Sequence, residues 1–144
     1  MRKKILICII FIALIITSGI FIPTFIIGKR PFSGLNHEQV QSISLFAIPP
    51  GVTVEIEDRD QIKEIVEILN TVIVYQKDNS SREYAGQLVR YTLLFTDGTV
   101  LEVGAYNPFL FINKKSYRTK YEPCEKLNAY GNALINERKE QKVD

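Results

Sequence analysis

One uninterrupted apolar run near the N-terminus constrains this chain more than any other feature. The run covers residues 5–27, reads ILICIIFIALIITSGIFIPTFII and contains no charged residue. Coiled as an α-helix, these 23 residues would extend about 34 Å, which is enough to cross a hydrocarbon core of roughly 30 Å. The run therefore predicts a transmembrane helix that anchors the rest of the chain to a membrane.

The same run also has the parts of a cleavable signal peptide. A basic segment at residues 2–4 precedes it, and Thr17 and Gly19 stand where a cleavage site needs small residues. Two features favour the anchor over cleavage. An Ala-x-Ala-like site is absent, and a cut after Gly19 would expose the apolar end IFIPTFII to water. Cleavage near Gly19, which would release a secreted domain, is the alternative.

Charges on the two sides of the run predict its orientation. Three basic residues at positions 2–4 and the α-amino group precede the run, whereas only Lys29 and Arg30 follow it. The positive-inside rule favours a cytoplasmic N-terminus. Residues 1–4 are then a cytoplasmic basic tail, and the C-terminal part of the chain lies outside the cell membrane.

The charge of the chain beyond the run excludes a nucleic-acid partner. The whole chain is formally +2, but five of its 18 basic residues flank the run. The part beyond the run contains the other 13 basic residues and all 16 acidic residues, so its net charge is about −3. It contains no basic cluster long enough for a nucleic-acid footprint. With Cys8 in the run and Cys124 far beyond it, no internal disulfide framework is expected either.

The first half of the external part predicts a tether, two strands and a helix. Residues 28–38 contain Pro and Gly without periodicity and indicate a short tether. Residues 39–48 and 52–57 alternate apolar and polar positions, as strands do. Asp58 is a suitable N-cap for a helix at 59–71. The helix has one apolar stripe, formed by Ile62, Ile65, Val66, Leu69 and Val72.

The stretch YTLLFTDGTVLEV predicts a β-hairpin with a definite register. After a short strand at 72–75 and a polar loop at 77–86, strands at 87–96 and 99–106 flank Asp97-Gly98. A three-residue loop with Gly98 in the left-handed conformation separates apolar from polar faces. This loop pairs Phe95 with Thr99, Leu93 with Leu101, Tyr91 with Val103 and Thr92 with Glu102.

The last elements complete an α+β fold. Residues 109–112 and 116–118 form a second hairpin around Asn113-Lys114-Lys115, and a helix begins at Glu122 with Pro123 as its first helical residue. It ends near Asn136. The order strand-strand-helix-strand-hairpin-hairpin-helix predicts a mostly antiparallel sheet with two packing helices, in one domain over residues 39–138, followed by a charged tail at 139–144.

This arrangement resembles a type of small, uncharacterised extracytoplasmic α+β domain that Gram-positive bacteria carry on one N-terminal membrane segment or lipid anchor. The resemblance rests on DRDQIKEIVEILN, YTLLFTDGTVLEV, FLFINKKSYR and the closing helix. These are structural signatures, so the resemblance implies a fold and a membrane location, and it implies no catalytic residues.

The chain offers no set of residues that indicates catalysis, a metal or another cofactor. His37 is the only histidine and stands in the predicted tether, and Cys124 falls on the apolar stripe of the last helix, where it predicts packing. Glu55 and Glu57 share one side of a strand, roughly 7 Å apart, as glycosidase carboxylates do, but such a pair more often faces solvent.

The candidate contact surface is aromatic. Asn107-Pro108 predicts a bend between Tyr106 and Phe109, and Arg82 and Tyr84 stand in the polar loop. Exposed aromatic side chains are common anchors in protein interfaces, although core packing is the usual role of such residues. The chain is thus expected to be a non-catalytic binding, sensor or accessory domain for an envelope protein or peptide. A secreted inhibitor or immunity-type domain is the alternative, and a small hydrolase is the least favoured.

Overall fold

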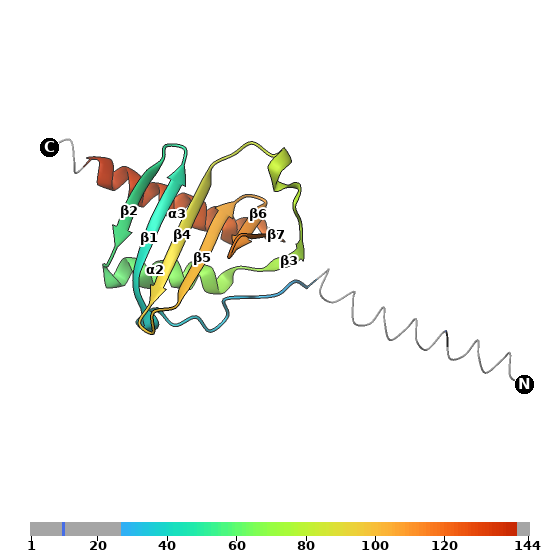
Figure 1. Cartoon of the computed structure of the whole chain (residues 1–144), viewed down its shortest axis with the longest axis horizontal. Coiled ribbons are helices and arrows are strands. Elements are labelled where there is room, and N and C mark those ends of the chain that lie inside the picture. Colours follow the sequence, from blue (N-terminus) through green and yellow to red (C-terminus); the bar gives the residue numbers. More distant parts are fainter. Residues whose placement is uncertain (1–9, 11–26, 141–144) are drawn as a thin grey trace, which may run out of the picture.

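The computed structural model of the chain describes Ile10 and residues 27–140, and Figure 1 shows the fold of this part. The predicted transmembrane run and the basic tail at 1–4 fall outside these residues, apart from Ile10 and Ile27. No helix within the described part is both long and apolar enough to cross a bilayer.

Seven strands form one antiparallel sheet in the order β2-β1-β4-β5-β6-β7-β3. The strands are β1 (Val40–Ile48), β2 (Val52–Ile56), β3 (Val74–Lys77), β4 (Leu88–Phe95), β5 (Val100–Tyr106), β6 (Phe109–Ile112) and β7 (Lys115–Thr119). Two α-helices, α2 (Arg59–Thr71) and α3 (Tyr121–Glu140), and two short 3₁₀ helices, η1 (His37–Gln39) and η2 (Ser80–Glu83), complete the described elements. The predicted α+β fold with a mostly antiparallel sheet and two helices is confirmed.

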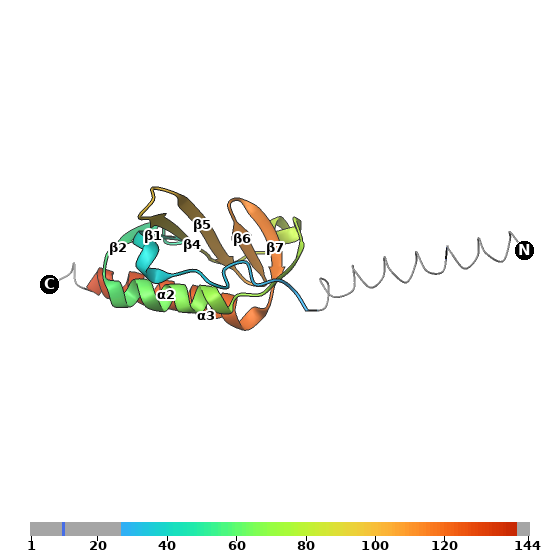
Figure 2. The same ribbon diagram turned by 90° about the horizontal axis from the view of Figure 1, so that it is seen from below.

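Both α-helices pack on the same face of the sheet (Figure 2). The core lies between them and the inward residues of the strands, among them Ile43, Leu45, Tyr91, Leu93 and Val103. From α3, the buried residues include Cys124, Leu127, Gly131, Leu134 and Ile135, which is the apolar face that the sequence predicts. The opposite face of the sheet has no covering helix among the described residues.

The helix at 59–71 forms where it is predicted, for the predicted reason. The carboxylate of Asp58 accepts hydrogen bonds from the backbone amides of Asp60 and Gln61, at 3.1 and 2.9 Å. These amides have no partner inside the helix, so the cap satisfies them. The predicted apolar stripe is buried at Ile62, Ile65, Val66 and Leu69.

The β4–β5 hairpin has the predicted register. Leu93 pairs with Leu101, Tyr91 with Val103 and Thr92 with Glu102. Gly98 has φ +81°, the Phe95 amide donates to the Thr99 carbonyl at 2.9 Å, and the Gly98 amide donates to the Phe95 carbonyl. The sorting of apolar and polar faces therefore predicts the strand pairing correctly.

Several strand boundaries differ from the prediction by one or two residues. The third strand covers Val74–Lys77 and not 72–75, because the Val72 amide still donates to Leu69 as the helix ends. The β6–β7 turn has two residues, Asn113 and Lys114, with φ of +45° and +68°, so Lys115 belongs to β7. Positive φ at both positions is the backbone of a type I′ turn, which suits the twist of a hairpin.

The last helix is longer than predicted at both ends. It begins at Tyr121, so Pro123 is its third residue, still within the first turn where an amide has no helical partner. It continues past Asn136 to Glu140, because the Glu, Arg and Lys residues at 137–140 are good helix formers. Part of the predicted tail at 139–144 is thus helical, and residues 141–144 lie outside the described part.

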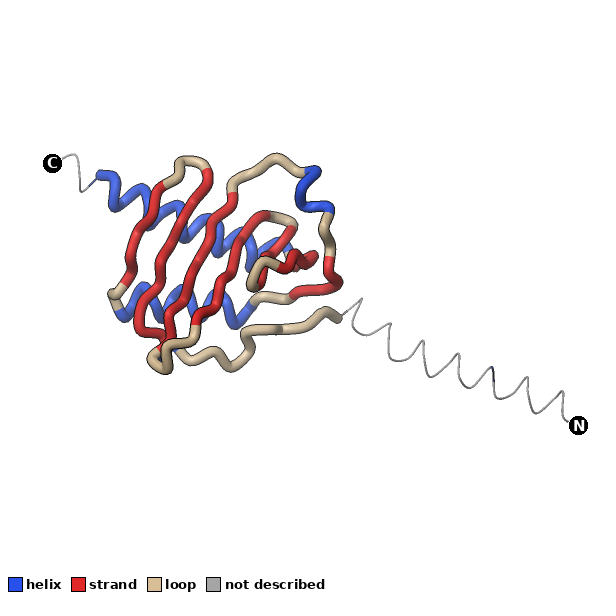
Figure 3. Tube along the Cα trace, viewed as in Figure 1, coloured by secondary structure: helices blue, strands red, loops and turns tan. Residues whose placement is uncertain are grey.

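Residues 28–38 belong to the folded domain, where the sequence predicts a tether. Lys29 forms an antiparallel bridge with Val74, through hydrogen bonds of 2.7 and 2.8 Å. Phe32 is buried in the core, and the Asn70 side chain accepts from the amides of Gly34 and Leu35. Figure 3 shows this segment as a loop that follows the lower edge of the domain to β1. Its lack of periodicity reflects an irregular backbone, which these tertiary contacts nevertheless fix.

Candidate functional site

The face of the sheet that the helices leave uncovered carries a hollow on its central strands. Alternation places Arg90 of β4 and Glu102 and Gly104 of β5 on this open face, because their sequence neighbours Val89, Tyr91, Val103 and Ala105 are buried beneath the helices. Because no described helix covers this face, a ligand can reach these side chains from solvent.

The loop after β3 closes one end of the open face. Asp78 pairs with Arg118 of β7 at 2.7 Å, and the hydroxyls of Ser81 and Ser116 lie 3.4 Å apart. Hydrogen bonds from the amide and hydroxyl of Ser80, and then from Arg118, lower the pKa of Asp78 to about 2. These contacts hold residues 78–84 against β6 and β7.

The same loop gathers three of the four residues predicted as a contact surface. The rings of Tyr84 and Phe109 meet edge to face with centroids 5.0 Å apart, and the hydroxyl of Tyr106 donates to the carbonyl of Tyr84. The guanidinium of Arg118 lies 4.6 Å from the centre of the Phe109 ring. The polar loop and the bend at 107–108 thus meet in space, although more than 20 residues separate Tyr84 from Tyr106.

The members of this cluster differ in exposure. Phe109 is fully buried, so it lies under the surface and supports the other rings. Tyr84 is 45% exposed, Tyr106 is half-buried, and Arg82 is exposed on η2. Of the predicted surface, Tyr84, Tyr106 and Arg82 are therefore accessible to a partner.

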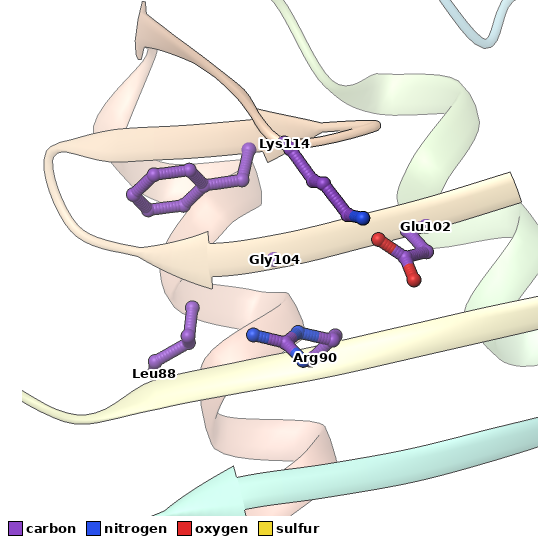
Figure 4. Close-up of a pocket in the computed structure, with 6 residues that line it drawn as sticks. Leu88, Arg90, Glu102, Gly104 and Lys114 are labelled. Atoms are coloured by element: carbon purple, nitrogen blue, oxygen red, sulfur yellow. The ribbon is translucent and has the colours of Figure 1, made fainter. Parts of the chain in front are cut away.

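Next to this cluster is a hollow of about 430 Å³, which we call the open-face groove. It is lined by Leu88, Arg90, Glu102, Gly104, Phe111 and Lys114. Figure 4 shows Arg90 and Lys114 on the two sides of the β5 segment that carries Glu102 and Gly104. Within the part of the chain that the structure describes, none of these three charged side chains forms an ion pair.

Gly104 makes the floor of the open-face groove. A Cβ atom at this position would lie 3.0 Å from Cδ1 of Leu88 and 3.3 Å from Cβ of Phe111. Both contacts are tighter than ordinary carbon–carbon packing. A side chain at position 104 would therefore fill the groove or push its apolar walls apart.

A second, smaller hollow of about 220 Å³ extends the open-face groove toward the loop. It is lined by Ser81, Arg82, Leu88, Tyr106 and Phe111, so it shares Leu88 and Phe111 with the groove. Two of the predicted contact residues, Arg82 and Tyr106, thus border the same surface as the groove. The two hollows thus combine apolar walls with Arg82 at the loop and with the charged side chains of Arg90, Glu102 and Lys114 around the groove.

The other residues that sequence analysis weighs lie elsewhere. His37 begins η1, and its carbonyl accepts from Arg59. Glu55 accepts from the Ser44 hydroxyl at 2.6 Å, and Glu57 follows the end of β2. No group of three His, Cys, Asp or Glu residues that could hold a metal occurs among the described residues.

Cys124 is a packing residue, as predicted. Its side chain is fully buried, and its thiol lies 3.2 Å from the Phe109 carbonyl. Burial raises the pKa of the thiol to about 12, so the reactive thiolate is not formed near neutral pH.

The residues of the open-face groove are not predictable as a group from the sequence. The strand alternation does place Arg90, Glu102 and Gly104 on one face, and a glycine in a strand can mark a close approach. Lys114 reaches the groove because β6 pairs with β5 across the bend at 107–108. The missing information is where the two helices pack, because this decides which face of the sheet stays open.

A comparison of this chain with protein-family models, with curated proteins and with solved structures finds no match.

Proposed function

We propose that this chain is a single-pass membrane protein whose C-terminal domain binds, without catalysis, an extended segment of an envelope protein or peptide. The domain would act as a sensor or accessory module on the outer side of the cell membrane. The observation that carries the proposal is the open-face groove, with its apolar floor and unpaired charged rim.

The chemistry of the groove specifies the ligand class. Leu88, Phe111 and the bare backbone of Gly104 accept an apolar side chain. Arg90 and Lys114 provide cations for an acidic group on the same ligand, since Arg in particular pairs with carboxylates. An extended peptide with one apolar and one acidic residue on the same side supplies both.

The membrane location is supported by the apolar run at 5–27 and by the positive charges before it. Protease treatment of intact cells tests it: the anchored protein should lose its C-terminal domain from the cell surface. A mature protein that begins at Ile20 in the culture medium would instead establish the secreted alternative, which Thr17 and Gly19 favour.

Site-specific photocrosslinking tests the groove. A photoreactive residue at Thr92, which neighbours Arg90 on the open face, should give one defined adduct in cells, and the same residue at Lys63 on α2 should not. Lys114→Gly should weaken the adduct because it removes a groove cation. The Lys114→Gly domain should have an equal or higher free energy of unfolding, since glycine tolerates a φ of +68° better than lysine does.

Lys115→Ala is the matched control, because it removes the next lysine, which does not line the groove. Its adduct should match that of the unaltered chain. Equal adducts from Thr92 and Lys63, or an adduct that Lys114→Gly leaves at full strength in a stably folded domain, would contradict binding at the groove.

A further inference from the structure

The end of the apolar run lies directly against one edge of the sheet. Ile27 is its last residue and is exposed, and Lys29, two residues later, already forms the bridge to Val74 of β3. β3 is an edge strand of the sheet. If residues 5–27 cross a membrane, as proposed above, this edge stands at the membrane surface without an intervening linker.

Basic side chains gather at the same edge. Arg30, Lys120 and Lys126 line one hollow of about 230 Å³ together with Ile73 and Pro123. The Lys120 amide donates to the Ile73 carbonyl at 2.9 Å, which places Lys120 next to the strand that Lys29 pairs with. Two distant parts of the sequence, residues 29–30 and 120–126, thus bring their positive charges together.

Acidic residues offset only part of this charge. Glu122 lies 3.7 Å from Lys120 and 3.4 Å from Lys126 and pairs with both. Glu64 and Glu67 line a neighbouring hollow between α2 and α3, which Lys126 also lines. The four cations at positions 29, 30, 120 and 126 therefore still exceed the three carboxylates around them, those of Glu64, Glu67 and Glu122.

An exposed aromatic residue completes the surface. Tyr121 begins α3 beside Lys120 and is 62% exposed. Tyrosine and basic residues are the side chains that proteins place at the membrane–water interface, where the ring contacts lipid and the polar end stays hydrated. We call Lys29, Arg30, Lys120, Tyr121 and Lys126 the anchor-side patch.

We propose that the anchor-side patch lies on an anionic phospholipid surface and orients the domain on the membrane. This inference rests on the proposed anchor. The remainder of the domain favours the same orientation, because the chain beyond Arg30 is net negative and an anionic membrane repels it. Only the anchor-side patch presents a local positive charge at the point where the apolar run ends.

Tryptophan fluorescence tests the inference, because the chain contains no natural tryptophan. The full chain with Tyr121→Trp is reconstituted into vesicles of phosphatidylcholine, alone or with phosphatidylglycerol, that carry brominated acyl chains. We expect a blue shift and quenching of the indole in the anionic vesicles. The blue shift and the quenching should both disappear in high salt. They should also disappear when Lys120→Glu and Lys126→Glu are added to the Tyr121→Trp chain.

Ile48→Trp is the matched control. Ile48 is exposed in β1, five strand positions or roughly 24 Å from β3, and its indole should stay unquenched in both vesicles. Thermal unfolding in detergent verifies that each variant is folded. Flotation of the vesicles in a density gradient shows whether the chain is bound to them. If the chain floats with both kinds of vesicle, equal quenching of the Tyr121→Trp indole in both lipids, or quenching in neither, would overturn the proposal that the anchor-side patch binds anionic lipid.

Flotation separates the two proposals. Flotation with both kinds of vesicle supports the membrane anchor, and the quenching measurement then tests whether the anchor-side patch binds anionic lipid. Flotation with anionic vesicles only would overturn the anchor and support the patch, and flotation with neither would overturn both.

Discussion

At the scale of single residues, Gly131 determines how closely α3 approaches the sheet. A Cβ atom there would lie 2.5 Å from Cγ1 of Val89 and 2.6 Å from the hydroxyl oxygen of Tyr91. The Tyr91 hydroxyl in turn donates to the carbonyl of Leu127, one turn earlier on the helix, so the ring is held in place. Both Val89 and Tyr91 are fully buried.

We therefore expect Gly131→Ala to lower the free energy of unfolding by about 1–3 kcal/mol, the usual cost of overpacking, despite the better helix propensity of alanine. Urea unfolding followed by circular dichroism measures it. Asn136→Ala, at an exposed position of α3, is the control and should stay within about 0.5 kcal/mol. A more stable Gly131→Ala variant would show that α3 packs further from the sheet than described.

At the scale of elements, the loop 78–84 closes one end of the open face and is held there mainly by side-chain contacts. Its main attachment is the pair of Asp78 and Arg118, with the Tyr84 ring over Phe109. The loop contributes one buried residue of its own helix η2, Ser81. Because polar contacts dominate, the attachment depends on the charge of Asp78.

This attachment should weaken in acid. The pKa of Asp78 falls from an ordinary 3.8 to about 2 in the folded chain, so its contribution is complete above about pH 4 and disappears as the pH falls through about 2. The nuclear Overhauser effect between the Tyr84 and Phe109 rings should decline over that interval. In Asp78→Asn it should be weak at every pH, and an unchanged signal in acid would show that other contacts hold the loop.

Two elements show what sequence patterns can predict. The helix α2 is predictable from Asp58 and the apolar stripe, and the β4–β5 register from face sorting around Gly98, because the deciding contacts lie within a few residues. The burial of Phe109 is not predictable in this way. It depends on Tyr84, which comes from a loop that pairs with a strand 40 residues later.

At the scale of the whole molecule, the domain begins at about Lys29 and not at residue 39. The bridge of Lys29, the burial of Phe32 and the Asn70 contacts are all long-range in sequence, so a pattern search sees only an irregular segment with Pro and Gly. The same reason explains the groove: which face of a sheet stays uncovered depends on where both helices pack.

Phe32→Ala should therefore destabilise the full chain by about 3 kcal/mol, as for other buried aromatic residues, and should speed amide exchange at Gly34 and Leu35. Ser33→Ala changes an exposed neighbour and should have an effect below about 0.5 kcal/mol. Unchanged unfolding and exchange in Phe32→Ala would restore the interpretation of residues 28–38 as a tether.

The docking of residues 28–38 has a consequence for what an anchored domain can reach. Eleven free residues would allow it to travel up to about 36 Å from the bilayer and to search that whole depth of the envelope. With the segment bound to the domain, the groove of a domain anchored as proposed would stay at one distance from the bilayer. If the domain is anchored and binds as proposed, a partner would have to present its segment in a thin layer next to the membrane, and a partner located deeper in the envelope would be out of range.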